Sequence, residues 1–109
     1  MDSISAPTAE GTYQTIYGVQ ENGLFLQRLD AERYVFRHAA SGLSLFYFLG
    51  AQPTARALLE RLSKRYDFQR DSTWVLKSQS EIHRQLQALG LTRRWLHRAW
   101  HYVTESCPM

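Results

Sequence analysis

Residues 12–29 have the sequence TYQTIYGVQENGLFLQRL, and this stretch predicts how the N-terminal half folds. Asn22-Gly23 separates two runs that are rich in Tyr, Ile, Val, Leu and Phe. Both turn residues tolerate the positive φ that a type I′ turn requires, so we expect a β-hairpin here. Alternate side chains from Tyr13 to Val19 would share one face of the first strand, because side chains repeat every two residues along a strand.

Two further segments extend this hairpin into a sheet. Residues 33–38 (RYVFRH) follow a turn around Asp30 and predict a third strand. Residues 43–49 (LSLFYFL) have no clear period and fit either a buried strand or the start of a helix, and their short length favours the strand. Residues 1–11 are small and polar and are expected to form a flexible tail. The N-terminal half is therefore expected to be a short antiparallel meander.

An amphipathic helix is expected after Pro53, a residue that suits the first turn of a helix. Its apolar residues recur at steps of three and four, the spacing of one helix face: Ala55, Leu58, Leu59, Leu62 and Tyr66. Residues 67–71 should then form a loop and residues 73–77 a short extended piece.

The last third of the chain predicts a pair of helices. Ser78 and Glu81 have the spacing of a capping box, and Gly90 is a typical helix terminator. Thr92 could then cap a second helix over residues 93–104. Two helices joined by so short a link must cross steeply, which is the geometry of a helix-turn-helix unit.

Charge is distributed unevenly along the chain. The 109 residues have a net charge of +3, yet residues 1–81 contain nine Lys and Arg against nine Asp and Glu. Residues 82–104 contain four Arg, three His and no acid. This placement suits a surface for an anionic partner, although a merely solvated helix face would have the same pattern.

The run from Ala88 to Trp100 (ALGLTRRWLHRAW) resembles the turn and recognition helix of bacterial helix-turn-helix DNA-binding proteins. A turn Gly flanked by apolar residues, then Thr, Arg and spaced apolar residues carries the resemblance. It implies that Arg93 or Arg94 contacts a guanine edge and that Arg84 and Arg98 meet phosphates. The nucleic-acid-binding residues implied in this way are Arg84, Thr92, Arg93, Arg94, His97, Arg98 and His101. So few phosphate contacts bind weakly, so a homodimer on double-stranded DNA is expected.

A second hypothesis starts from the aromatic residues, which make up 13% of the chain. Trp95 falls outside the apolar stripe of its expected helix and should be partly exposed. Exposed Trp, Tyr and Arg are enriched at protein–protein hot spots. The protein could therefore bind a regulatory protein, for example as an inhibitor of a transcription factor, without contacting DNA. The residues expected to form that surface are Trp95, Tyr102, Tyr13 and Tyr17.

Several chemistries find little support in the sequence. There is a single cysteine, Cys107, and no Gly-rich phosphate loop, nucleophile elbow or close carboxylate pair. His97 and His101 have metal-ligand spacing on a helix, but a third ligand would have to be His83, from another helix. We therefore expect no enzyme activity, cofactor or metal. The longest apolar stretch, residues 43–51, is too short to cross a membrane, so a cytoplasmic location is expected.

Together these patterns predict a single α+β domain over residues 12–104. It would consist of the meander, one amphipathic helix and a C-terminal helix-turn-helix-like pair, between tails at residues 1–11 and 105–109. The expected function is that of a small transcriptional regulator.

Overall fold

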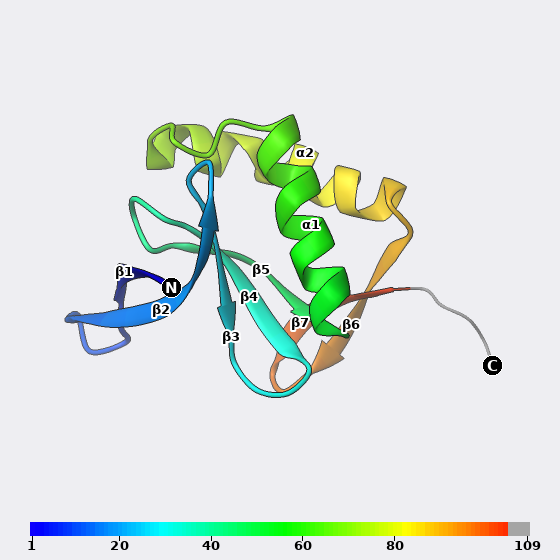
Figure 1. Cartoon of the computed structure of the whole chain (residues 1–109), viewed down its shortest axis with the longest axis horizontal. Helices are drawn as coiled ribbons and strands as arrows, with labels where there is room; N and C mark the ends of the chain where they lie inside the picture. Colours follow the sequence, from blue (N-terminus) through cyan, green and yellow to red (C-terminus); the bar gives the residue numbers. More distant parts are fainter. Residues whose placement is uncertain (105–109) are drawn as a thin grey trace.

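A mixed sheet of seven strands with two helices on one face forms the body of the protein in the computed structural model, which describes residues 1–104 (Figure 1). The strands make up 42% of these residues and the helices 30%. In chain order the elements are β1 (Asp2–Pro7), β2 (Tyr13–Glu21), β3 (Leu24–Arg28), β4 (Arg33–His38), β5 (Ser44–Leu49), α1 (Gln52–Arg65), α2 (Ser72–Ala88), β6 (Leu91–Leu96) and β7 (Ala99–Thr104).

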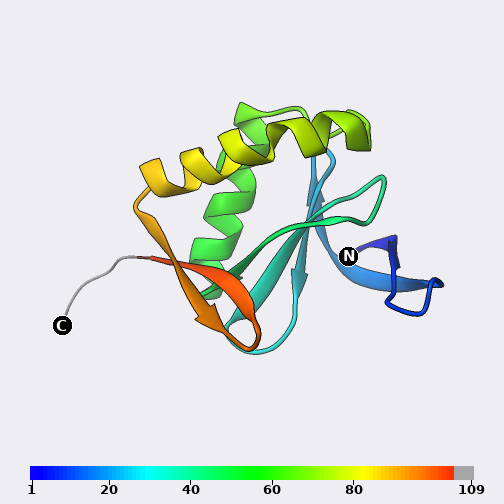
Figure 2. The ribbon, with the colours of Figure 1, turned by 180° about the vertical axis from the view of Figure 1, so that it is seen from behind.

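The strands lie in the order β1-β2-β3-β4-β5-β7-β6. Neighbours are antiparallel except β5 and β7, which are parallel and are connected through α1, α2 and β6. This connection places both helices over one face of the sheet, as the view from behind shows (Figure 2). The strands β1 and β6 form the two edges, so the last hairpin, β6–β7, lies at the end of the sheet away from β1–β2.

The main core fills the space between the sheet and the two helices. It combines Leu24 and Leu26 of β3, Phe36 of β4 and Phe46 of β5 with apolar residues of α1 and α2. Phe36 and Phe46 stack with their ring centroids 4.5 Å apart. A smaller core on the opposite face joins β1 and β2 to Phe25 of β3.

The predicted hairpin at Asn22-Gly23 is confirmed. Asn22 has a φ of 49° and Gly23 a φ of 85°, and β2 and β3 pair on either side of them. A Cβ on Gly23 would lie 2.4 Å from the backbone carbonyl of Phe68, so the turn also packs against the α1–α2 loop. The strands predicted at residues 33–38 and 43–49 are present as β4 and β5, in agreement with the preference for a strand at the second segment.

The amphipathic helix is also confirmed. Pro53 lies in the first turn of α1, and Ala55, Leu58, Leu59 and Leu62 are buried. The exposed side has an ion pair between Lys64 and Glu60, 3.0 Å apart.

Residues 1–11 do not form the expected tail, because Asp2–Pro7 pair with β2 as β1. Alternation explains the strand: Ile4 and Ala6 point toward Ile16 and Phe25 in the smaller core. The segment is short and mostly polar, so the alternation of inward and outward side chains along its six residues is hard to recognise in the sequence. The prediction of an unstructured N-terminus was wrong for these residues.

The helix α2 begins earlier than the sequence predicted. Asp71 caps it, because its carboxylate accepts a hydrogen bond from the backbone N–H of Trp74 at 3.0 Å. Residues 73–77, expected to be extended, therefore form the first turns of the helix, and Ser78 lies inside it. The predicted end is confirmed: α2 stops at Ala88 and Gly90 adopts a φ of 92°.

The expected second C-terminal helix does not exist, so the α+β fold with a helix-turn-helix-like pair is wrong. Residues 91–104 form the antiparallel hairpin β6–β7 instead. Thr92, Trp95, Tyr102 and Val103 are β-branched or aromatic residues that favour strands. The two-residue turn His97-Arg98 has φ values of 50° and 63°, the left-handed values of a type I′ turn, without the usual Asn or Gly.

This turn leads to a stability prediction. Left-handed backbone costs an ordinary L-residue about 1–2 kcal/mol, and Asn and Gly avoid most of it. The double variant His97→Asn/Arg98→Gly relieves this strain, but Gly loses more conformational entropy on folding than Arg does. We therefore expect a net increase of about 1 kcal/mol in the free energy of unfolding, measured by denaturant titration. Arg94→Gly, inside β6, is the matched control and should lower it. A loss of stability in the double variant would contradict the hairpin turn.

Neither α1 nor α2 has the length and apolar character that a membrane-spanning helix requires. The expected tail at residues 105–109, with Cys107, lies outside the described residues.

Candidate nucleic-acid interface

The β6–β7 hairpin presents different residues on its two faces. Its register pairs Arg93 with Tyr102 and Trp95 with Trp100, and these four residues lie on the face that carries the helices. Arg94 pairs with His101 on the opposite face. The two consecutive arginines therefore point to opposite sides of the ribbon, as successive residues of a strand must.

An exposed aromatic pair lies near the tip of the hairpin. Trp95 is 59% exposed and Trp100 51%, and their rings meet edge to face with centroids 5.4 Å apart. The guanidinium of Arg93 lies 5.1 Å from the centre of the Trp100 ring, a cation–π distance. Cross-strand aromatic contacts of this kind stabilise a ribbon and fix its register. On the expected helix, Trp100 would lie on the same apolar face as Leu96 and Val103. The alternation of Leu91, Arg93 and Trp95 is instead the pattern of a strand, and it is the signal that indicates the hairpin in which Trp100 is exposed.

A groove separates the hairpin from the second half of α2. His83 and Arg84 of α2 line it together with Arg93 and Tyr102 of the hairpin, in a hollow of about 410 Å³. The Nδ1 atom of His83 lies 2.5 Å from the hydroxyl of Tyr102. Burial lowers the pKa of His83, and the charge of Arg93 lowers it further. Burial also raises the pKa of the Tyr102 hydroxyl. Both groups are therefore held in their neutral forms beside two guanidinium groups.

The opposite face of the hairpin is less strongly cationic. Arg94 and Thr92 are exposed there and share a hollow of about 540 Å³ with Glu32. His101, by contrast, is fully buried: its Nδ1 donates to the carbonyl oxygen of Ala99, and its Nε2 accepts from the Nε of Arg33 at 3.4 Å.

The turn of the hairpin supplies two more basic side chains. His97 and Arg98 are both exposed at the tip. Because the turn joins the ends of both strands, Arg98 extends the line of positive charge beyond the sheet. Arg93, Arg94 and Arg98 therefore occupy one face, the other face and the tip of a single ribbon.

No carboxylate neutralises these arginines within residues 1–104. The ion pairs in that part of the chain join Arg33 to Asp30 and Lys64 to Glu60. Arg84, Arg93, Arg94 and Arg98 have no acidic partner within 4 Å there. The acid-free sequence from residue 82 to 104 thus becomes a cationic ribbon with one helical arginine beside it.

The structure brings together only some of the residues predicted to bind DNA and only some of those predicted to bind a protein partner. Arg84 and Arg93 meet in the groove, and the remaining exposed basic residues follow the hairpin. His101 and Tyr102, both predicted as contact residues, are buried in the folded chain. Tyr13 and Tyr17 are exposed on β2, but the strand order separates them from Trp95.

The histidines do not form the arrangement that a metal would need. On a hairpin, His97 and His101 are not one helical turn apart, and their ring centroids lie 6.0 Å from each other. Within residues 1–104 no three His, Cys, Asp or Glu side chains lie close enough together to hold a metal ion.

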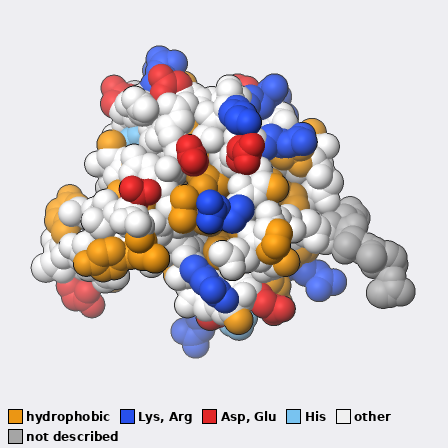
Figure 3. Space-filling model, in the orientation of Figure 1, with side chains coloured by type: hydrophobic (Ala, Val, Ile, Leu, Met, Phe, Trp, Pro, Cys, Tyr) orange, Lys and Arg blue, Asp and Glu red, His pale blue; other side chains and the backbone are white. Residues whose placement is uncertain are grey.

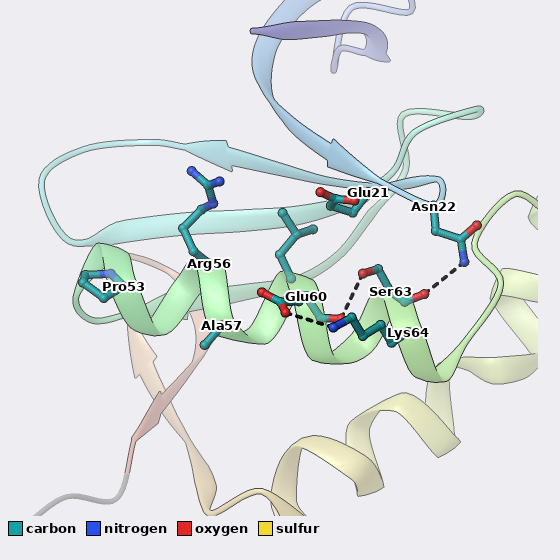
Figure 4. Close-up of a pocket in the computed structure, with 9 residues that line it drawn as sticks. Glu21, Asn22, Pro53, Arg56, Ala57, Glu60, Ser63 and Lys64 are labelled. Atoms are coloured by element: carbon teal, nitrogen blue, oxygen red, sulfur yellow. Dashed lines mark hydrogen bonds and ion pairs between the residues drawn. The ribbon is translucent and has the colours of Figure 1, made fainter.

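Another hollow lies between α1 and the β2–β3 turn, with a volume of about 650 Å³ (Figure 4). Several of its polar groups are paired with one another. Asn22 donates to the carbonyl of Ser63, and Lys64 pairs with Glu60. Acidic and basic side chains are interspersed on this side of the molecule (Figure 3), so it has no net preference for an anion or a cation.

The two perturbed histidines predict a loss of stability in weak acid. Burial lowers the pKa of both His83 and His101, and Arg33 and Arg93 add positive charge beside them. The unfolded chain, with an ordinary pKa of about 6.5, therefore binds more protons than the folded chain. We expect stability to be full above pH about 6.5 and to fall as the pH drops toward the lower folded pKa values.

Thermal unfolding measured from neutral pH to about pH 5 tests this expectation. The variant His101→Asn keeps a donor for the Ala99 carbonyl and should flatten the profile. An unchanged profile in His101→Asn would show that this histidine does not contribute.

No family model matches the chain, and searches of curated proteins and of solved structures gave no significant match either.

Proposed function

We propose that the protein is a small, non-enzymatic, cytoplasmic transcriptional regulator that binds double-stranded DNA through the β6–β7 hairpin. The observation that carries the proposal is that Arg93, Arg94 and Arg98 lie on one exposed ribbon without an acidic partner in residues 1–104. The mode differs from the helix insertion expected from the sequence. A two-stranded ribbon fits the major groove of DNA, which is about 12 Å wide.

The distribution of charge supports an approach with the tip of the ribbon first. A groove of DNA has a phosphate backbone on each side and base edges at its floor. In that orientation Arg93 and Arg94, on opposite faces, would each point to one phosphate wall. Arg98 at the turn would reach the floor, where an arginine can bind the edge of guanine.

A single hairpin has few phosphate contacts, so we propose that the protein acts as a homodimer. Each neutralised phosphate adds about −0.9 to the slope of log affinity against log salt. Three or four contacts alone bind weakly at cellular salt, whereas two hairpins on adjacent half-sites double the number of contacts.

Fluorescence anisotropy of a labelled mixed-sequence duplex, titrated at salt concentrations between about 50 and 200 mM, tests the proposal. We expect binding with a slope of about −3 per protomer. A slope near zero, or no binding at the lowest salt, would refute it. Sedimentation of the free protein in the same buffers reports the proposed dimer.

The exposed Trp95–Trp100 pair favours a second function, binding to a regulatory protein without DNA. Within residues 1–104 the outer edge of β6 has no neighbouring strand, so a partner strand could add to the sheet there beside two exposed indole rings. Trp is among the residues that dominate the energy of protein interfaces. Under this alternative, Trp95→Ala would abolish co-purification of one defined partner, and the complex would survive salt that dissociates DNA.

A further inference from the structure

The groove between α2 and the hairpin has two chemically different halves. One half is polar and cationic, with Gln79, Gln87 and the two arginines Arg84 and Arg93 along it. The other half is a hollow of about 260 Å³ against the apolar side chains of Leu45, Phe46 and Trp100. The two hollows adjoin, because His83, Arg93 and Tyr102 line both of them. Figure 2 shows α2 lying above the hairpin, with the two joined at the β6 end.

We propose that this groove is a binding site for a small phosphomonoester with a flat apolar body, of the kind that a nucleoside monophosphate represents. This site goes beyond the proposed contact with DNA and does not depend on it. The size fits, since pockets for small ligands measure about 300–1,000 Å³ and the polar hollow alone measures about 410 Å³.

The charge at the polar end favours a phosphate. Two guanidinium groups from different elements, Arg84 of α2 and Arg93 of β6, face a space that no carboxylate of residues 1–104 lines. Two monocations match the two negative charges of a phosphomonoester, and the planar guanidinium donates to phosphate oxygens in pairs. A monocarboxylate would leave one of the two cations without a partner.

Neutral donors complete the polar end. His83 is half-buried and neutral, and its Nδ1 is occupied by the Tyr102 hydroxyl. Where the phenol donates to Nδ1, the proton of the neutral ring is on Nε2, which can then donate to a ligand oxygen. The contact with Tyr102 thus orients the imidazole at the junction of the two halves.

The apolar end suits a flat ring. The indole of Trp100 is half exposed, and Arg93 is held over it at 5.1 Å. A ligand whose phosphate meets Arg93 therefore has its attached body directly beside Trp100. Stacking of a base on an aromatic side chain contributes to affinity without requiring a particular base.

Isothermal titration calorimetry with adenosine 5′-monophosphate, inorganic phosphate and adenosine tests the site in the absence of DNA. The nucleotide should bind more tightly than either of its halves. Arg84→Ala/Arg93→Ala should weaken binding of the nucleotide and of phosphate by about tenfold or more, because charge-assisted hydrogen bonds are lost. Trp100→Leu should weaken binding of the nucleotide and of adenosine by about tenfold but leave phosphate unchanged.

Two further variants keep the test decisive. Arg56→Ala/Arg61→Ala removes the same two charges from the exposed side of α1 and should leave all three affinities unchanged. Arg84→Ala alone changes one exposed helix position, so a smaller loss of affinity is expected with the fold intact. The proposal is overturned if the nucleotide does not bind at millimolar concentration. It is also overturned if it binds no better than phosphate, or if the arginine and tryptophan variants bind it as the original chain does.

Discussion

Replacement of Arg93, Arg94 and Arg98 together by alanine is expected to lower the affinity for mixed-sequence duplex DNA by about a hundredfold or more. Each arginine is exposed on the hairpin, without an acidic partner in residues 1–104, and so is free to meet a phosphate or a base edge. Hydrogen bonds to charged groups contribute about 1.5–3 kcal/mol each, less where water screens them. The salt slope should also become shallower by about 1 for each phosphate contact removed.

The matched control removes the same charge from another surface. Arg56, Arg61 and Arg65 are exposed on α1, and their joint replacement by alanine changes the net charge of the protein by the same amount. Anisotropy titrations should show nearly unchanged affinity and salt slope for this control. Equal losses in both triple variants would mean that DNA responds to net charge alone and that the hairpin has no special role.

The second large effect concerns the core between the helices and the sheet. Leu62 of α1 is 0% exposed, and Leu62→Ala should lower the free energy of unfolding by about 2–5 kcal/mol through lost burial and the cavity it leaves. Leu76 of α2 is 62% exposed, so Leu76→Ala should change it by less than about 0.5 kcal/mol.

Both are leucine-to-alanine changes within helices, so helix propensity is matched and burial is the variable that differs. Urea titration of the two variants measures the effect, with an unchanged slope in urea as the sign that both still unfold in one step. Similar losses in the two variants would contradict the placement of the helices on the sheet.

The sequence predicts an element correctly where the residue types and the spacing of apolar residues indicate the same structure. Asn22-Gly23 favours a type I′ turn, and both residues have the positive φ of that turn. The apolar residues from Ala55 to Leu62 have the spacing of a helix face, and this segment is a helix. Gly90 ended α2 as expected because positive φ suits a residue without a Cβ. These elements are determined by neighbours a few residues away, so the sequence could reveal them.

The C-terminal segment was misassigned because two periods compete in it. Leu96, Ala99, Trp100 and Val103 fit a helix face, while Leu91, Arg93 and Trp95 fit one side of a strand. Tertiary pairing decided in favour of the strand: β7 lies parallel to β5, and this long-range contact leaves no local trace. The turn at His97-Arg98 also lacks the residues that usually mark a hairpin.

The sequence indicates the charge of the candidate site but not the arrangement of its side chains. The absence of acids from residues 82–104 correctly located a cationic surface, and Arg84 and Arg93 do lie on the same groove. The helical assignment placed Arg93 and Arg94 side by side, whereas a strand separates them onto opposite faces. Burial of His101 depends on β5 and Arg33, both distant in sequence, so no local pattern could have predicted it.

An NMR titration of the isotope-labelled protein with a short duplex tests most directly whether the hairpin contacts DNA. Backbone and arginine Nε–H signals of β6, β7 and their turn should shift progressively, while signals of β1 and of the exposed side of α1 should stay in place. Shifts confined to β1–β2 or to α1, with the hairpin signals unmoved at saturating DNA, would contradict the account.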